Sequence, residues 1–259
     1  MQVLMRPWGA MHCRIDGPEG GPTVIFANSL GTDLRVWDGL LPHLPAHLRL
    51  VRYDKRGHGL SGPGGHSTIE EYADDAIALI KATASGPVIF VGLSIGGLIA
   101  QAVASAAPEL IRALVLSNTA ARLGTKDGWQ ARINAVNDHG LPHIADSIME
   151  RWFAPAFRAT PALTLWRNML IRTPARGYTA ACAALAGADR TNATRALRMP
   201  TLVIAGAEDG SSPPDVVRGL ADLIPGAAFH LIPGAGHLPC VEVPAAFAAI
   251  LIPFIEAQT

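Results

Sequence analysis

The sequence predicts an α/β fold with a mainly parallel, doubly wound sheet, and three observations support this. Short apolar runs alternate with helix-like stretches from about residue 10 onward, which is the order of βαβ units. Several of these runs are continuously apolar, as expected for parallel strands covered on both faces. One interval of roughly 80 residues interrupts the alternation without a clear strand, and we interpret it as an inserted helical cap, because ordinary connections are much shorter.

Six strands are expected in the core, at residues 23–27, 48–53, 87–91, 113–117, 201–205 and 228–232. Four core helices are expected between and after them, at residues 69–84, 96–107, 214–223 and 244–256. The first helix begins with Ser-Thr-Ile-Glu-Glu at residues 67–71. This places a hydroxyl side chain three residues before a glutamate, which is the spacing of a capping box.

The long interval sets the predicted domain boundaries. Residues 1–118 and 200–259 form the core, and residues 119–199 form the cap, with helix-like stretches at 129–137, 143–153, 161–171 and 177–186. From Thr119 to Pro200 there are eleven basic and five acidic residues, a net charge of +6, and the remaining ten basic and sixteen acidic residues give −6. A basic lid favours a small anionic substrate. Equally, these charges could face solvent or pair with the acidic core.

The overall composition excludes several classes of protein. Basic and acidic residues balance at 21 each, so we expect no general attraction to nucleic acid or to an anionic membrane. The three cysteines (Cys13, Cys182 and Cys240) are far apart and odd in number, which indicates neither a disulfide framework nor a thiolate metal site. Without a signal-peptide pattern or a run of 18 apolar residues, a soluble cytoplasmic protein is expected. The oligomeric state stays open, a homo-oligomer included.

A candidate nucleophile lies directly after the predicted strand 87–91. Residues 92–97 read Gly-Leu-Ser-Ile-Gly-Gly and lead into a helix-compatible stretch. This is the G-x-S-x-G nucleophile elbow of the α/β-hydrolase fold, in which a strained turn exposes the serine hydroxyl above the sheet. Ser94 is therefore the predicted nucleophile. The alternative is an ordinary glycine-rich turn with a helix-capping serine.

A serine nucleophile requires a base, and the base requires an orienting acid. This fold orders its triad serine, acid, histidine along the chain. His237 follows the last predicted strand in a glycine-rich segment, whereas His58 precedes Ser94 and is expected in a hydrogen-bonded turn; the other seven histidines are expected at the surface. Asp209 follows the strand 201–205 and is the predicted acid, although the adjacent Glu208 could compete and Asp209 could instead cap the next helix.

An oxyanion hole should provide two fixed donors to the substrate carbonyl oxygen. The backbone N–H of Ile95, directly after the nucleophile, is one candidate. The loop after the strand 23–27 should provide the other, and we assign it to the N–H of Leu30. No metal or cofactor is expected: there is no Walker or HExxH motif, and the GxGxxG pattern at residues 57–62 is followed by Pro63 instead of a helix.

Beyond these motifs, the chain resembles the 3-oxoadipate enol-lactonases from about residue 24 to residue 254. The core motifs that carry the resemblance are NSLGTD at 28–33, WD at 37–38, YDKRGHG at 53–59 and GLSIGG at 92–97. The more specific motifs are SNTAA at 117–121 and, in the cap, GWQAR at 128–132, ERWF at 150–153 and GYTAAC at 177–182. Lys55, Ile95 and Gly210 depart from the pattern of many members, which leaves room for a sister activity.

The resemblance implies a cofactor-independent serine hydrolase of aromatic-compound (β-ketoadipate) catabolism, in which Ser94, Asp209 and His237 form the triad. The implied substrate is a small enol-lactone bearing a carboxylate. Arg132 beside Trp129 is the expected carboxylate ligand, because a guanidinium binds a carboxylate through two hydrogen bonds, and Trp152 would line the apolar part; Arg132 could equally be a surface arginine. The alternatives are another capped carboxylesterase or lactonase, and a non-catalytic ligand-binding protein of the same fold.

Overall fold

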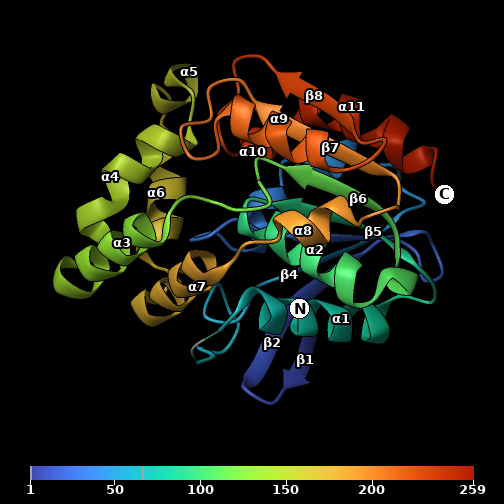
Figure 1. Cartoon of the computed structure of the whole chain (residues 1–259), viewed down its shortest axis with the longest axis horizontal. Helices are drawn as coiled ribbons and strands as arrows, with labels where there is room; N and C mark the ends of the chain where they lie inside the picture. Colours follow the sequence, from blue (N-terminus) through green and yellow to red (C-terminus); the bar gives the residue numbers. More distant parts are fainter. Residues whose placement is uncertain (1, 66) are drawn as a thin grey trace.

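The computed structural model describes residues 2–65 and 67–259, and its centre is an eight-stranded sheet in the order β1-β2-β4-β3-β5-β6-β7-β8 (Figure 1). The strands are β1 (Gln2–Arg6), β2 (Gly9–Asp16), β3 (Thr23–Ala27), β4 (Arg49–Tyr53), β5 (Val88–Leu93), β6 (Ile111–Ser117), β7 (Thr201–Gly206) and β8 (Ala228–Ile232). From β4 to β8 all neighbours are parallel. All six predicted strands are confirmed to within two residues.

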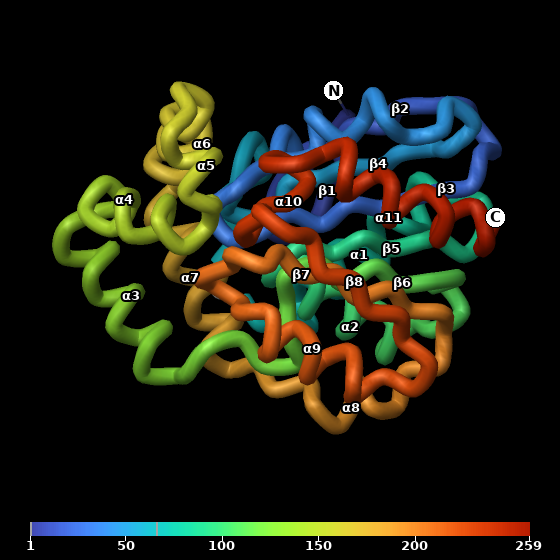
Figure 2. Tube along the Cα trace, turned by 90° about the horizontal axis from the view of Figure 1, so that it is seen from above, coloured from blue at the N-terminus to red at the C-terminus, as the bar shows by residue number. Residues whose placement is uncertain are grey.

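Helices cover both faces of the sheet, which confirms the doubly wound α/β-hydrolase fold. The core helices are α1 (Ile69–Thr83), α2 (Ile95–Ala106), α8 (Thr191–Arg195), α9 (Pro214–Leu223), α10 (Pro239–Glu242) and α11 (Pro244–Glu256), with short 3-10 helices η1 (Leu34–Trp37), η2 (Leu41–His43) and η3 (Pro108–Leu110). Figure 2 shows α8 and α9 on one side of the strands and α10 and α11 on the other. Every residue of β3, β5 and β7 is buried, which explains their continuously apolar sequence. Thr68 and Glu71 form the predicted capping box of α1.

The sequence did not predict the hairpin of β1 and β2, which lies at one edge of the sheet. Both strands of the hairpin run antiparallel to their neighbours, and β2 joins the sheet through β4. Val3 and Met5 of β1 are exposed, so this strand has neither the apolar run of a central strand nor a clean inward–outward alternation. Its turn at Pro7 and Trp8 also lacks the Asn-Gly or Asp-Gly signal of a tight hairpin.

The chain between β6 and β7 is helical throughout its regular structure. It contains α3 (Lys126–His139), α4 (Leu141–Trp152), α5 (Pro155–Arg158), α6 (Leu163–Ile171) and α7 (Ala175–Gly187) before α8. Figures 1 and 2 agree in placing α3 to α7 together at one end of the sheet. In contrast, α8 lies against α2 and α9 of the core, where Thr194 Oγ1 donates to Gln101 Oε1 at 2.6 Å.

Candidate active site

Ser94 lies in a sharp turn between β5 and α2, and its backbone angles of φ 59° and ψ −119° are unusual for a residue with a side chain. A Cβ on Gly92 would lie 2.3 Å from the carbonyl oxygen of Gly96, and a Cβ on Gly96 would lie 2.2 Å from that of Ala27. Glycine is therefore required on both sides of Ser94, because any side chain there would collide with backbone. The turn holds Ser94 at the carboxyl end of β5, where its side chain lines a cavity.

His237 and Asp209 lie in the loops after β8 and β7 and are joined by a hydrogen bond of 2.8 Å between Nδ1 and Oδ2. The other Asp209 oxygen accepts the N–H groups of Ser211 and Ser212, at 2.7 and 2.9 Å. Burial raises the pKa of Asp209, but His237 and hydrogen bonds from the Asn118 amide and the Ser212 N–H outweigh it and hold the pKa below its usual value. Asp209 thus stays ionised and holds the proton of His237 on Nδ1.

Asn118 completes this arrangement and was missed by the sequence analysis. Its amide nitrogen donates to Asp209 Oδ2 at 2.9 Å and to the carbonyl of Gly236 at 3.1 Å. Asn118 is fully buried after β6, with a left-handed backbone at φ 49°. It therefore ties the acid to the loop that carries the histidine. The SNTAA motif marked this position, but nothing in the sequence connected it with Asp209.

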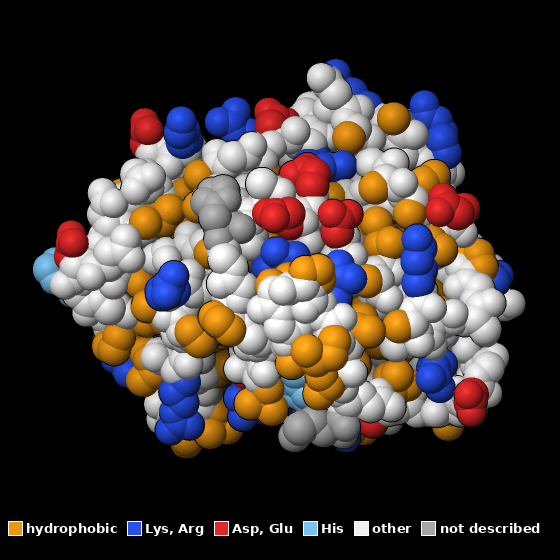
Figure 3. Space-filling model, turned by 90° about the horizontal axis from the view of Figure 1, so that it is seen from below, with side chains coloured by type: hydrophobic (Ala, Val, Ile, Leu, Met, Phe, Trp, Pro, Cys, Tyr) orange, Lys and Arg blue, Asp and Glu red, His pale blue; other side chains and the backbone are white. Residues whose placement is uncertain are grey.

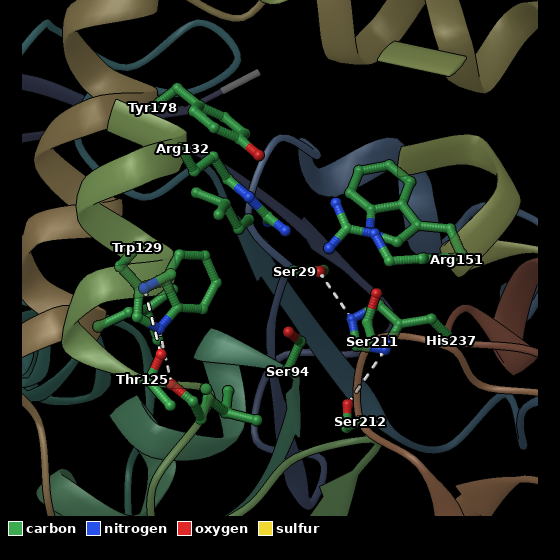
Figure 4. A pocket seen from close by; sticks show the side chains of 16 residues that line it. Ser29, Ser94, Thr125, Trp129, Arg132, Arg151, Tyr178, Ser211, Ser212 and His237 are labelled. Atoms are coloured by element: carbon green, nitrogen blue, oxygen red, sulfur yellow. Dashed lines mark hydrogen bonds between the residues drawn. The ribbon is translucent and has the colours of Figure 1, made fainter. Parts of the chain in front are cut away.

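The imidazole Nε2 of His237 faces the same cavity as Ser94 (Figure 4). Its hydrogen-bond partner is the hydroxyl of Ser29, at 3.4 Å. Within residues 2–65 and 67–259, no hydrogen bond joins Ser94 to His237. Catalytic hydrogen bonds are often long or poorly aligned in enzymes without substrate and form fully only in the complex with substrate.

Two backbone N–H groups beside Ser94 have no acceptor among the residues that the structure describes. They belong to Leu30 and Ile95, which are 5% and 0% exposed. Buried N–H groups without an acceptor are rare in folded proteins. Their positions, one after Ser94 and one in the loop after β3, are those predicted for the oxyanion donors.

The predicted cap residues all reach the cavity, which has a volume of about 310 Å³. Arg132 stacks over the ring of Trp129, with its Cζ 4.8 Å from the ring centroid. Trp152 is buried and lies nearly parallel to the His237 ring, with centroids 6.5 Å apart. Arg132 thus lies in the cavity instead of being fully exposed to solvent.

Arg151 was not predicted, although it falls within the ERWF motif. Figure 4 shows its guanidinium pointing toward that of Arg132 across the cavity, with the hydroxyl of Tyr178 beside Arg132. Burial lowers the pKa of Arg151, and the like charge of Arg132 lowers it further. In the described part of the chain, neither guanidinium forms an ion pair with a carboxylate. Two cations that face each other without an anion between them form a site for an anionic group.

Glu208 and the histidines other than His237 were the remaining candidates or alternatives for the site, and the structure places those that it describes away from the triad roles. Glu208 is exposed, so of the two candidate carboxylates it is Asp209 that hydrogen-bonds His237. His58 is buried in the turn after β4, where its Nε2 accepts the N–H of Gly31. The prediction that the other histidines lie at the surface was wrong for His12, which is 7% exposed and contacts Asp54 at 2.8 Å; His66 lies outside the described residues.

The model of the "alpha/beta hydrolase fold" family matches residues 22–244. The chain is 32% identical to 3-oxoadipate enol-lactonase 1 of Acinetobacter baylyi, across 99% of this chain and 97% of that protein. It is 35% identical to 3-oxoadipate enol-lactonase 2 of the same organism, across 92% of this chain and 90% of that protein. The crystal structure of the enol-lactonase from Burkholderia xenovorans LB400 superposes with a TM-score of 0.94 at 33% identity, covering 98% of this chain and 100% of that one.

None of the described helices has the length and apolar character needed to cross a membrane. The elbow at Ser94, the two converging loops and the full-length similarity all agree with the family match. The chain belongs to the α/β-hydrolase fold family, and within it to the group that includes the 3-oxoadipate enol-lactonases.

Proposed function

We propose that this chain hydrolyses 3-oxoadipate enol-lactone to 3-oxoadipate, without a cofactor. The observation that carries the proposal is the pair of unpaired guanidiniums, Arg132 and Arg151, in the cavity that Ser94 and His237 also line. A carboxylate between them would hold a small lactone with its carbonyl toward Ser94. The enol-lactonase relatives across the full length of the chain support this choice of substrate.

The proposed chemistry follows the triad. His237 Nε2 takes the proton of Ser94 as its oxygen attacks the lactone carbonyl, and Asp209 stabilises the imidazolium that forms. The negative charge on the carbonyl oxygen is bound by the N–H groups of Leu30 and Ile95. As the ring opens, His237 returns the proton to the leaving enolate, and the free enol tautomerises to the ketone. Water then attacks the acyl-enzyme by the same route and releases Ser94.

The first test uses freshly generated 3-oxoadipate enol-lactone as substrate. Ser94→Ala should lower kcat by about 10⁴-fold or more, because the hydroxyl forms the acyl-enzyme, while the circular dichroism spectrum stays that of wild type. Ser105→Ala, in an exposed position on α2, the helix that follows Ser94, is the matched control and should keep wild-type activity. Full activity in Ser94→Ala would remove Ser94 from its proposed role.

The second test concerns the carboxylate site. Arg132→Ala and Arg151→Ala should each raise KM for the lactone by about tenfold to a hundredfold, because each removes charge-assisted hydrogen bonds. Turnover of the neutral ester p-nitrophenyl acetate should change little. Arg176→Ala is the control, since it removes an exposed arginine from α7. Equal losses on both substrates would assign the two arginines to the structure of the cap.

We further propose that the enzyme works in the cytoplasm on small anionic lactones, with no nucleic-acid or membrane partner. Cys13, Cys182 and Cys240 are buried and free, which suits a reducing compartment. Oxidised and reduced protein should therefore have the same mobility on a non-reducing gel.

A further inference from the structure

Beneath the loop that carries Leu30, the ammonium group of Lys55 is buried, with the residue only 2% exposed. Its Nζ donates to the carbonyl of Ser29 at 2.6 Å and to that of Thr32 at 3.4 Å. Among the described residues it forms no ion pair with a carboxylate. The nearby Asp54 is occupied by His12 and by backbone N–H groups. Lys55 is thus a buried cation bound mainly to backbone carbonyls.

The same loop is held by further hydrogen bonds. His58 Nε2 accepts the N–H of Gly31 at 3.1 Å, and the carbonyl of Ser29 also accepts Thr32 Oγ1 at 2.9 Å and the N–H of Thr32 at 3.3 Å. The N–H of Leu30, between these anchors, has no acceptor in the part of the chain that the structure describes. The loop is therefore fixed from its core side, while one amide stays available to the cavity that Ser29 and Leu30 line.

The carbonyl bound by Lys55 and the free N–H belong to one peptide group, that between Ser29 and Leu30. The peptide is planar and trans, so its C=O and N–H point in opposite directions. A cation on the oxygen fixes the N–H direction away from Lys55. It also draws electron density toward the oxygen, which makes the N–H a stronger donor.

We propose that Lys55 is a positioning residue of the oxyanion hole, which orients and polarises the Ser29–Leu30 peptide so that the Leu30 N–H binds the tetrahedral intermediate more tightly than the ground state. This inference rests on the proposed serine hydrolase function, because it needs charge to develop on a carbonyl oxygen beside Ser94. It does not depend on which ester or lactone is the substrate.

A purely structural role does not account for a charged group at this place. Burial lowers the pKa of Lys55 to about 7, although Asp54 and Asp33 oppose that shift. Burying the charge therefore opposes folding, and a neutral side chain could fill the space at a lower cost. The electric field of this cation acts most strongly on the group nearest to it, which is the Ser29–Leu30 peptide.

The experiment compares Lys55→Met and Lys55→Gln with Thr32→Val, which removes a neutral donor to the same carbonyl. At pH 6.5, below the pKa of Lys55, where its side chain carries the charge, we expect kcat/KM for p-nitrophenyl acetate to fall by about tenfold to a hundredfold in both Lys55 variants, less than the loss of a whole oxyanion donor. Inhibition by phenylboronic acid, whose tetrahedral adduct on Ser94 places an oxygen in the hole, should weaken by the same factor. Inhibition by adipate, a simple carboxylate, should not change, and Thr32→Val should have the smaller effect.

The outcomes separate this proposal from the one above. Loss of turnover in Ser94→Ala together with wild-type kcat/KM and boronate inhibition in both Lys55 variants would overturn the role of Lys55 alone. An equal loss of boronate and adipate binding would assign Lys55 to the shape of the site, and so would failure of both neutral variants to fold while Thr32→Val folds. Unimpaired turnover in Ser94→Ala would instead reject the hydrolase mechanism.

Discussion

At the residue scale, the buried charge of Lys55 predicts how stability depends on pH. Its pKa is about 7 in the folded protein, against an ordinary value of 10.5. Between these values the unfolded chain binds a proton that the folded protein has released, so the free energy of unfolding rises with pH. The loss of folding stability caused by burying this charge is at its full size below pH 7 and is absent above pH 10.5.

In Lys55→Gln, the free energy of unfolding should lack this rise with pH, because glutamine has no titratable proton. Urea unfolding at intervals from pH 6.5 to pH 10.5 would measure the difference in unfolding free energy between wild type and variant, in which the other titrating groups cancel. We expect the unfolding free energy of the variant to exceed that of wild type most at pH 6.5, and this difference to shrink steadily above pH 7. A difference that stays constant would show that Lys55 remains charged throughout. The groups that face it are Asp54, Asp33 and the neutral His58.

The site residues that the sequence could predict are those set by local backbone. Ser94 lies in a turn that only a G-x-S-x-G pattern permits, and Asp209 and His237 follow strand ends in an order fixed by topology. Arg151 and Lys55 act through partners that are distant in sequence, Arg132 and the Ser29 peptide. A local sequence pattern cannot predict a contact between distant residues, so the surroundings of Arg151 and Lys55 could be seen only in the structure.

At the scale of elements, the end of α4 is bonded to both loops that carry the triad. The carbonyl of Trp152 accepts the N–H of His237 at 2.7 Å, and the carbonyl of Arg151 accepts that of Gly210 at 3.0 Å. Glu242 of α10 strengthens the connection, since its two oxygens accept the N–H groups of Gly236 and Ala154 at 2.9 and 2.8 Å. The helix that presents Arg151 is thereby held in register with the catalytic loops.

Glu242→Gln should disturb this connection, because an amide offers one acceptor oxygen and turns a donor toward the other N–H. We expect the free energy of unfolding to fall by about 1–3 kcal/mol, the cost of an unsatisfied buried N–H, and kcat to fall as the His237 loop loosens. Urea unfolding and steady-state kinetics would measure both. Glu208→Gln, in an exposed position, is the control. A variant with wild-type stability and kcat would show that the backbone hydrogen bonds of Trp152 and Arg151 are enough to hold α4 against the catalytic loops.

The elements themselves were predictable where burial dictates composition. The buried central strands and α9 and α11 matched closely, because apolar runs and proline at a helix start are strong signals. The short α5, α8 and α10 were missed, since four or five residues show no period, and so was the half-exposed hairpin of β1 and β2.

At the scale of the whole molecule, the uneven distribution of charge has a consequence for substrate capture. The segment from Thr119 to Pro200 carries +6, and the rest of the chain carries −6. Some of this charge is neutralised locally, for example between Arg190 and Glu70 at 2.8 Å. Figure 3 likewise shows acidic side chains gathered beside basic ones on the underside. Among the described residues that line the cavity, Arg132 and Arg151 are the arginines, and neither forms an ion pair with a described carboxylate.

A cavity with two unpaired cations should attract an anionic substrate from solution, and salt should weaken that attraction. The Debye length shortens from about 30 Å at 0.01 M salt to about 3 Å at 1 M, so kcat/KM for the carboxylate-bearing lactone should fall steadily as sodium chloride is raised across that range. The value for neutral p-nitrophenyl acetate should stay nearly flat, and so should that for the lactone in Arg132→Ala/Arg151→Ala. If salt lowered kcat/KM equally for both substrates in the wild type, its effect would be on the fold. The basic cap would then have no part in selecting an anion.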